Sequence, residues 1–246
     1  MSGNESSEQD SPPGKRIIVA IDGPAGAGKS TVARHLARYF GLLNLETGAM
    51  YRAFALKALR AAVPLDASAG LERLAAGTTI RLEAGEEHNR VFLDGEDVTG
   101  LLRNQTVTEA ASRVSVFPAI RAWMVSLQQQ LAAGGGVVME GRDIGTVVFP
   151  HAEVKIFLDA APEVRGLRRF DQLGDKATQP AEEVIRDLRA RDERDRNRAE
   201  SPLKAAADAV VLDSTKMTLE QVVEAAEGIV AARLGLAGRP CRQAAG

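Results

Sequence analysis

The stretch IIVAIDGPAGAGKSTVARHLARYF, residues 17–40, decides the fold of this chain. Its first five residues are apolar and mostly β-branched, which is typical of a central strand covered on both faces. From Ser30 to Phe40 the apolar side chains recur at helical spacing, with basic residues on the other face. Between strand and helix, GPAGAGKS (residues 23–30) matches the full spacing G-x-x-x-x-G-K-[ST]. Strand, loop and helix in this order predict a phosphate-binding loop.

The glycine-rich loop has the chemistry of a polyphosphate site. Its glycines let the backbone curl so that successive N–H groups point at phosphate oxygens, and the following helix adds its positive end. Lys29 can reach the β- and γ-phosphates, and the Ser30 hydroxyl can ligate Mg²⁺. The alternative is a glycine-rich turn with an incidental lysine. The predicted ATP phosphate-binding residues are Gly23, Pro24, Ala25, Gly26, Ala27, Gly28, Lys29, Ser30 and Thr31.

Such a loop does not by itself define the class of protein, because GTPases, transport ATPases and motor proteins share it. The chain has no Asn-Lys-x-Asp run that would read guanine and no Leu-Ser-Gly-Gly-Gln signature of a transport ATPase. With 246 residues, it is also short for an oligomeric motor ATPase. A compact phosphotransferase fits these observations best.

Further apolar runs predict an α/β fold, a doubly wound five-stranded parallel sheet with helices on both faces. The other candidate strands are residues 42–45, 137–139, 154–158 and 209–212. Helical spacing predicts helices over residues 50–62, 105–133, 161–173, 181–198 and 219–234. Residues 64–104 break this rhythm, since alternating apolar residues and turn-prone glycines predict a small antiparallel hairpin or three-stranded flap.

Composition limits the partners and the setting of the chain. The formal net charge is -2 and aromatic residues make up 4%, which argues against a nucleic-acid polymer as partner. Three scattered His and the single Cys241 provide no zinc-ligand spacing and no internal disulfide, which fits a cytoplasmic protein. No apolar run is long enough for a membrane span, and no surface pattern demands a partner, so a monomer is expected. Residues 1–15 are interpreted as a disordered leader and residues 235–246 as a flexible tail.

Three polar clusters have the composition of an acceptor site. ETGAMYR (residues 46–52) offers Thr47 and Arg52, although a helix cap followed by a surface arginine explains it equally well. EGRDIGT (residues 140–146) places an acid directly after a buried strand, where P-loop enzymes hold Mg²⁺-bound water; the alternative is a polar loop held by an Arg–Asp pair. RARDERDRNRAESP (residues 189–202) puts three arginines on one helical face. That face is either a solvated helix with many salt bridges or a site for phosphate groups.

Together these residues resemble the bacterial-type cytidylate kinases, a nucleoside-monophosphate kinase family. The resemblance runs from residue 21 to residue 215 and rests on the segments IDGPAGAGKST, ETGAMYR, SRVSVFPAIR, EGRDIGTVVFP, KIFLDA, RDERDRNRA and AADAVVLDST. It implies one kinase domain over residues 16–234, with a core made of residues 16–63, 134–172 and 199–234. It also implies an acceptor-binding region over residues 47–133 with the insert 64–104, a short lid at about residues 173–182, and an arginine helix over residues 183–198.

The resemblance further implies roles for single residues. The acceptor residues that it implies are Thr47, Arg52, Arg142 and Arg191 for the phosphate, Ser112, Arg121 and Asp143 for the cytosine edge, and Asp195 and Arg198 for the sugar. Arg194 would lie near the transferred phosphate. Glu46 and Glu140 depart from the family pattern, which often has Asp at these positions, and this puts the local geometry in doubt more than the activity.

The expected reaction is transfer of the γ-phosphoryl group of ATP to CMP or dCMP. Its catalytic residues would be Lys29, Arg142, Arg191 and Arg194, with Mg²⁺ on Ser30 and Glu140 reaching it through water. An ionised Asp143 favours the cytosine amine over the uracil carbonyl by about 1–3 kcal/mol. The alternatives are a kinase for another small acceptor, such as UMP or AMP, and a nucleotide-binding regulatory module without turnover.

Overall fold

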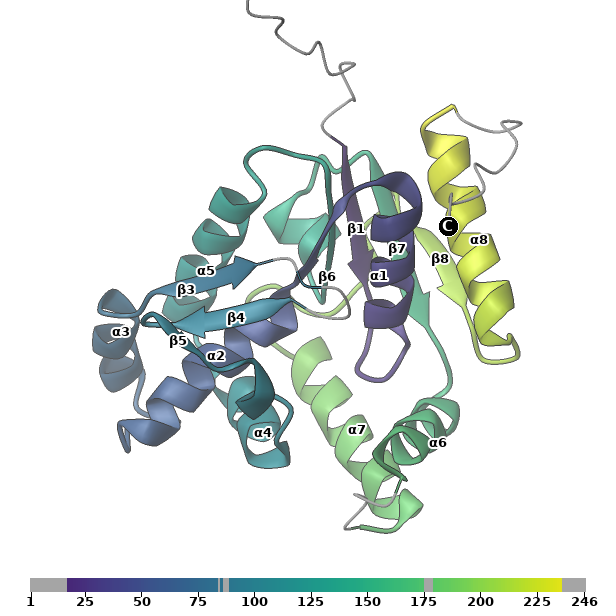
Figure 1. Ribbon diagram of the computed structural model, residues 1–246. Coiled ribbons are helices and arrows are strands. Elements are labelled where there is room, and N and C mark those ends of the chain that lie inside the picture. Colours follow the sequence, from purple (N-terminus) through teal and green to yellow (C-terminus); the bar gives the residue numbers. More distant parts are fainter. Residues whose placement is uncertain (1–16, 84, 86–88, 175–178, 236–246) are drawn as a thin grey trace, which may run out of the picture.

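The computed structural model describes residues 17–83, 85, 89–174 and 179–235 (Figure 1). The predicted leader, nearly all of the predicted tail and residues 175–178 of the predicted lid lie outside this part of the chain.

A parallel sheet forms the centre of the molecule (Figure 1). Within the described residues it has five strands, in the order β2-β6-β1-β7-β8. They are β1 (Ile18–Asp22), β2 (Leu43–Glu46), β6 (Val137–Gly141), β7 (Val154–Asp159) and β8 (Val210–Asp213). Every neighbouring pair is parallel, which confirms the predicted sheet.

Alternation along the strands gives the sheet two buried faces. Val19 and Ile21 point to one face, where α1 (Lys29–Phe40) and α8 (Leu219–Arg233) cover them. Ala20 and Met139 point to the other, against α5 (Pro118–Leu131) and the short π-helix η2 (Ile144–Val148). Because both faces are covered, the strands are apolar throughout, as the first run of residues predicted.

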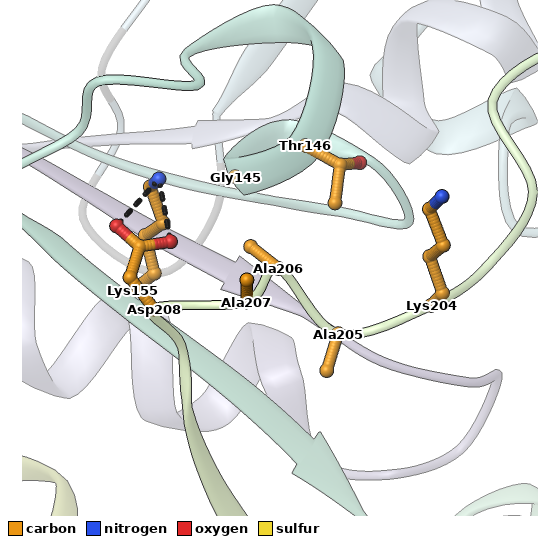
Figure 2. Close-up of a pocket in the computed structure, with 8 residues that line it drawn as sticks. All are labelled: Gly145, Thr146, Lys155, Lys204, Ala205, Ala206, Ala207 and Asp208. Carbon is orange, nitrogen blue, oxygen red and sulfur yellow. Dashed lines mark hydrogen bonds and ion pairs between the residues drawn. The ribbon is translucent and has the colours of Figure 1, made fainter.

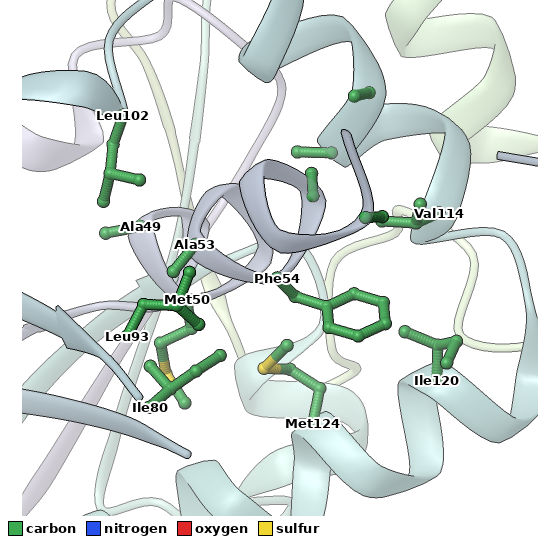
Figure 3. Close-up of a cluster of buried hydrophobic side chains, with 14 of the residues drawn as sticks. Ala49, Met50, Ala53, Phe54, Ile80, Leu93, Leu102, Val114, Ile120 and Met124 are labelled. Carbon is green, nitrogen blue, oxygen red and sulfur yellow. The ribbon is translucent and has the colours of Figure 1, made fainter. Parts of the chain in front are cut away.

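The acceptor side of the predicted domain has its own apolar cluster (Figure 3). Met50 and Phe54 of α2 (Thr47–Arg60) pack against Ile120 and Met124 of α5. A second sheet covers α2, and its three antiparallel strands are β3 (Ile80–Glu83), β4 (Arg90–Leu93) and β5 (Glu96–Asp97). This confirms the predicted three-stranded flap.

Two helix predictions on this side need correction. The single helix predicted over residues 105–133 is wrong, because the chain forms α4 (Gln105–Val114) and α5 with a break between them. Pro118 causes the break, since it lacks an N–H and disfavours the helical conformation of Phe117, whose φ of -77° and ψ of 123° are extended. The insert also contains two helical elements that the alternation did not predict, α3 (Ser68–Ala76) and the 3₁₀ turn η1 (Thr99–Leu101).

Two further helices, α6 (Pro162–Leu173) and α7 (Ala181–Arg196), pack against each other beyond the carboxyl end of the sheet (Figure 1). The predicted arginine helix therefore forms, although it ends two residues before Arg198. In the described part of the chain, no helix is long and apolar enough to cross a membrane.

Candidate active site

The glycine-rich loop follows β1 and leads into α1, as predicted. Gly23 has φ of 150°, and a Cβ at this position would lie 2.0 Å from the carbonyl oxygen of Leu158 on the neighbouring strand. Gly28 has φ of 92° and caps α1 in a left-handed conformation. Only glycine meets these two demands without strain, so the loop geometry explains its glycines independently of any ligand.

Lys29 lies buried at the start of α1, where its ammonium group donates to the carbonyl oxygen of Pro24 at 2.6 Å. Burial and the charge of Arg142 lower the pKa of Lys29 to about 7, although Glu140 opposes the shift. The ammonium thus lacks enough local negative charge to hold its proton firmly. A polyphosphate in the loop would supply that charge.

Glu140 connects the loop to the acceptor side. The Ser30 hydroxyl donates to its Oε1 at 2.6 Å, and the Thr47 hydroxyl donates to its backbone oxygen at 2.7 Å. Burial raises the pKa of Glu140, while Lys29 lowers it. Residues from β6, α1 and α2 therefore converge at the carboxyl edge of the sheet.

An arginine-rich cavity of about 60 Å³ lies beside Glu140. It brings together eight of the nine predicted acceptor residues, namely Thr47, Ser112, Arg121, Arg142, Asp143, Arg191, Asp195 and Arg198. The ninth, Arg52, does not line this cavity but lies on the same turn of α2 as Gly48. Arg194 is exposed on α7 and donates to the Ser112 hydroxyl at 3.3 Å.

Two acidic residues form ion pairs with the arginines of this cavity. Arg121 pairs with the buried carboxylate of Asp143 and also donates to the carbonyl oxygen of Ser115 at 3.2 Å. Asp195 on α7 accepts from Arg142 Nε at 2.9 Å and pairs with Arg198. Of the predicted arginine face, Arg191 and Arg198 therefore line the cavity together with Asp195, whereas Arg194 is exposed.

Some N–H donors of these arginines nevertheless have no hydrogen-bond partner in the part of the chain that the structure describes. Among the described residues, the buried Nε atoms of Arg52, Arg191 and Arg198 have no hydrogen-bond partner. Burial and the charge of neighbouring Arg142 lower the pKa of Arg191 to about 10. Half-buried cations with unused donors favour the binding of an anion, and planar guanidinium groups suit the oxygens of a phosphate.

Sequence reasoning assigned no role to Asp22 and Tyr51. Asp22, at the end of β1, accepts from the backbone N–H groups of Ile144 at 2.8 Å and Gly145 at 2.7 Å. Burial raises its pKa to about 6, although these two donors oppose the shift. Tyr51 lines the acceptor cavity, and burial raises its pKa to about 12. An acid placed directly before the glycine-rich loop was the available signal for Asp22.

A second cavity, of about 420 Å³, lies beneath η2 and the chain before β8 (Figure 2). Its buried cation, Lys155, already binds both carboxylate oxygens of Asp208 at 2.8 Å and the carbonyl oxygen of Pro150 at 2.5 Å. Three alanines form much of the remaining wall. The other polar lining residues are Lys204 and Thr146, whose buried hydroxyl has no hydrogen-bond partner within the described chain, so this cavity has fewer cations than the arginine-rich one.

The loop at the end of β1 and the cation-lined cavity beside it define a P-loop phosphotransferase. A protein-family model described as cytidylate kinase matches residues 19–231. The chain belongs to the cytidylate kinase family.

Curated relatives agree with this assignment. The chain is 52% identical to the cytidylate kinase of Pelotomaculum thermopropionicum, over 84% of this chain and 92% of that protein. It is 44% identical to the cytidylate kinase of Pasteurella multocida, over 85% and 92% of the two chains. With the cytidylate kinase of Solibacter usitatus it shares 47% identity over 89% and 94%.

Proposed function

We propose that this chain transfers the γ-phosphoryl group of ATP to CMP or dCMP, giving ADP and CDP or dCDP. The observation that carries the proposal is the set of half-buried arginines beside the phosphate-binding loop whose buried Nε atoms have no hydrogen-bond partner among the residues that the structure describes. The Ser30 hydroxyl of the loop donates to Glu140, and Arg142 of the cavity follows Glu140 by two residues, so the acceptor side and the donor-side lysine lie close together. Two phosphate groups bound there would approach each other.

The reaction needs positioning and charge stabilisation rather than a strong base. A nucleotide phosphate oxygen is already ionised near neutral pH and can attack the γ-phosphorus in line. Lys29, Arg142, Arg191 and Arg194 would stabilise the negative charge on the transferred group. Thr47 and Arg52 would help Arg142 and Arg191 to hold the acceptor phosphate.

The residues around Ser30 fit the Mg²⁺ that accompanies ATP. The Ser30 hydroxyl and the Glu140 carboxylate are oxygen ligands of the type that Mg²⁺ prefers, and they lie 2.6 Å apart. Ser30 would bind the ion directly and Glu140 through water. When bound, Mg²⁺ neutralises charge on the donor phosphates.

The buried pair Arg121–Asp143 supports cytosine as the acceptor base. An ionised Asp143 accepts from the exocyclic amine of cytosine, whereas the carbonyl of uracil would repel it. Ser112 and Arg121 would complete the base edge, and Asp195 and Arg198 would hold the sugar. Because about 60 Å³ is far below the several hundred Å³ of a typical ligand pocket, the arginines over the cavity must withdraw for CMP to enter.

An acceptor panel tests this function. ADP release is measured with CMP, dCMP, UMP and AMP at equal concentrations, and CMP and dCMP should give the highest rates. A higher rate with UMP or AMP would favour the kinase for another acceptor. ATP binding without acceptor-stimulated ADP release would favour the regulatory module.

Replacement of Lys29 tests whether this residue is needed for catalysis and not for folding. We expect Lys29→Ala to lose most turnover while the circular dichroism spectrum and the melting temperature stay close to those of the wild type, because the substitution removes a buried cation that gains little from the fold itself. Near-normal turnover of a folded variant would contradict the role given to Lys29.

The cellular location, the oligomeric state and the division of the chain into regions are also proposals. We infer that it acts as a cytoplasmic monomer, because it has one cysteine and no surface pattern that demands a partner. Light scattering in the presence and absence of both nucleotides tests the monomer. The division into core, acceptor-binding region and lid stays a prediction, supported by the separate apolar cluster around α2.

A further inference from the structure

Arg165 and Asp192 form a buried ion pair beneath the phosphate-binding loop. Arg165 lies on α6 and is fully buried, and Asp192 on α7 is 3% exposed. Arg165 NH1 lies 2.7 Å from Asp192 Oδ2, and Arg165 Nε donates to the carbonyl oxygen of Ala160 at 2.7 Å. Neither residue lines the acceptor cavity, and neither is among the residues predicted to bind a substrate.

This pair binds both polar backbone groups of Ala25 in the loop. The carbonyl oxygen of Ala25 accepts from Arg165 NH1 at 2.8 Å, and its N–H donates to Asp192 Oδ1 at 3.3 Å. The next residue, Gly26, has φ of 75°, and a Cβ there would lie 3.3 Å from both Cβ and the backbone oxygen of Arg165. The first half of the loop is thus packed against α6 and α7, and the pair holds the orientations of the two peptide groups on either side of Ala25.

The same helix α7 also carries acceptor-side residues. Arg191 precedes Asp192 directly and lines the arginine-rich cavity, and Asp195 follows three residues later and binds Arg142. Because successive helix residues are about 100° apart, Asp192 can contact the loop while Arg191 faces the cavity. The helix therefore connects the two substrate sites through adjacent residues.

The chemistry of the pair argues against a role in stability alone. A carboxylate beneath a loop that receives anionic phosphates is electrostatically unfavourable, and burying two charges costs desolvation energy that an apolar pair would avoid. What apolar side chains could not supply is the two hydrogen bonds that orient Ala25. The pair therefore fixes the position of the loop and does not add to the stability that comes from burying apolar surface.

We propose that Arg165 and Asp192 are positioning residues that hold the donor-phosphate loop at a fixed place relative to the arginines of α7. The inference rests on the proposed phosphoryl transfer, in which the two phosphates must meet in line. A misplacement of about 1 Å can lower a rate about a hundredfold. Loss of the pair should therefore lower kcat more than it changes the affinity for CMP.

The double variant Arg165→Met/Asp192→Leu tests this inference, because apolar side chains of similar size often preserve the fold when a buried ion pair is replaced. Its kcat with CMP should fall about tenfold to a hundredfold. The Kd for CMP from calorimetry should stay within about threefold of the wild type, since Arg142 and Asp143 are unchanged. Leu71→Ala, a fully buried residue of α3 that lies outside both sites, is the control for lost stability.

A folded double variant with wild-type kcat would overturn the inference. If the double variant does not fold, the single variants Asp192→Asn and Arg165→Lys test the inference, because each keeps part of the hydrogen bonding. Both should show a lower kcat at unchanged CMP affinity. Wild-type kcat in both would overturn the inference.

A second measurement separates failure of the inference from failure of the proposed function. Hydrogen exchange of residues 25–29 needs no acceptor and should be faster in the variants than in the wild type. Unchanged exchange overturns the inference even if CMP is the acceptor. Absence of CMP-dependent ADP release by the wild type would instead remove the proposed function while the exchange result stands.

Discussion

Among single residues, Asp143 is the one on which we propose that the choice of base depends. Its carboxylate is buried, and Arg121 binds one of its oxygens. Arg121 is itself anchored to the carbonyl oxygen of Ser115, so the acid is held by a chain of contacts rather than by solvent. A carboxylate fixed in this way can accept hydrogen bonds but cannot donate them while it is ionised.

Asp143→Asn should weaken the preference for CMP. The amide can donate to the uracil carbonyl as readily as it accepts from cytosine, so the ratio of kcat/KM for CMP to that for UMP should fall about tenfold to a hundredfold. The ratio is measured by coupled ADP assays, with Asp97→Asn on exposed β5 as the matched control. A lower overall rate with an unchanged ratio would show that Asp143 does not read the base.

Asp22 connects the end of β1 to the start of η2. It lies at the end of β1 directly before the loop, and its two acceptor bonds fix the start of η2, which follows Arg142 and Asp143. Burial raises its pKa from 3.8 to about 6. The folded protein therefore holds a proton between these two pH values that the unfolded chain has released.

This shift predicts a particular pH dependence of stability. The contribution of Asp22 is fully present below about pH 4 and is lost as the pH rises through about 6, a change of about 3 kcal/mol for a pKa that moves from 3.8 to about 6. Urea unfolding of wild type and Asp22→Asn is compared from pH 5 to pH 7.5. The stability of the wild type relative to the variant should fall across this range, because the other titrating groups are shared and cancel. A constant difference would mean that burial does not raise this pKa.

Among the helices, the pair α6 and α7 sets the position of the arginines. The two helices meet at Gly166, where a Cβ would lie 2.2 Å from Ile185 Cγ1 and 3.1 Å from Ile185 Cα. No side chain fits at this point unless the helices separate. Their close approach also places Arg165 and Asp192 next to each other beneath the loop.

Gly166→Ala should therefore separate α6 from α7. Overpacking should destabilise the fold by about 1–3 kcal/mol, and kcat should fall because Arg191 and Arg194 move with α7. Gly228→Ala in the middle of α8 is the matched control, since a Cβ there meets nothing within 4 Å. That control should be more stable by about 0.5–1 kcal/mol through helix propensity. Equal stability of the two variants would contradict the close packing at Gly166.

Sequence patterns predicted the elements that have strong local signals. The strand, loop and helix of residues 17–40 appear where the pattern placed them, because alternation and helical spacing are properties of neighbouring residues. Pro118 itself indicates the break between the two helices. The prediction missed it because apolar residues continue at helical spacing on both sides of this proline. Asp22 had a local signal, its place directly before the loop, although its partner Ile144 is distant in the sequence. The roles of Arg165 and Asp192 could not be predicted, since Ala25, which both contact, lies more than 100 residues away from each of them and becomes a neighbour only in the fold.

The whole molecule contains more than one apolar core. One cluster lies beneath α1 and α8 on the central sheet, and another surrounds Met50 and Phe54 on the acceptor side. The acceptor cavity uses residues from α2, α4, α5, β6 and α7, so it spans parts of the chain that do not share one core. A ligand bound there would add contacts between elements that belong to separate apolar clusters.

Hydrogen exchange should reveal this arrangement when the nucleotides are added one at a time. CMP alone should slow exchange in residues 105–121 and 189–198, because Ser112, Arg121 and Arg191 would contact it, whereas a non-hydrolysable ATP analogue with Mg²⁺ should slow residues 23–31. UMP at the same concentration serves as the control and should protect the acceptor segments less. If CMP slowed exchange only in residues 23–31, it would be occupying the donor loop, and the arginine-rich cavity would not be the acceptor site.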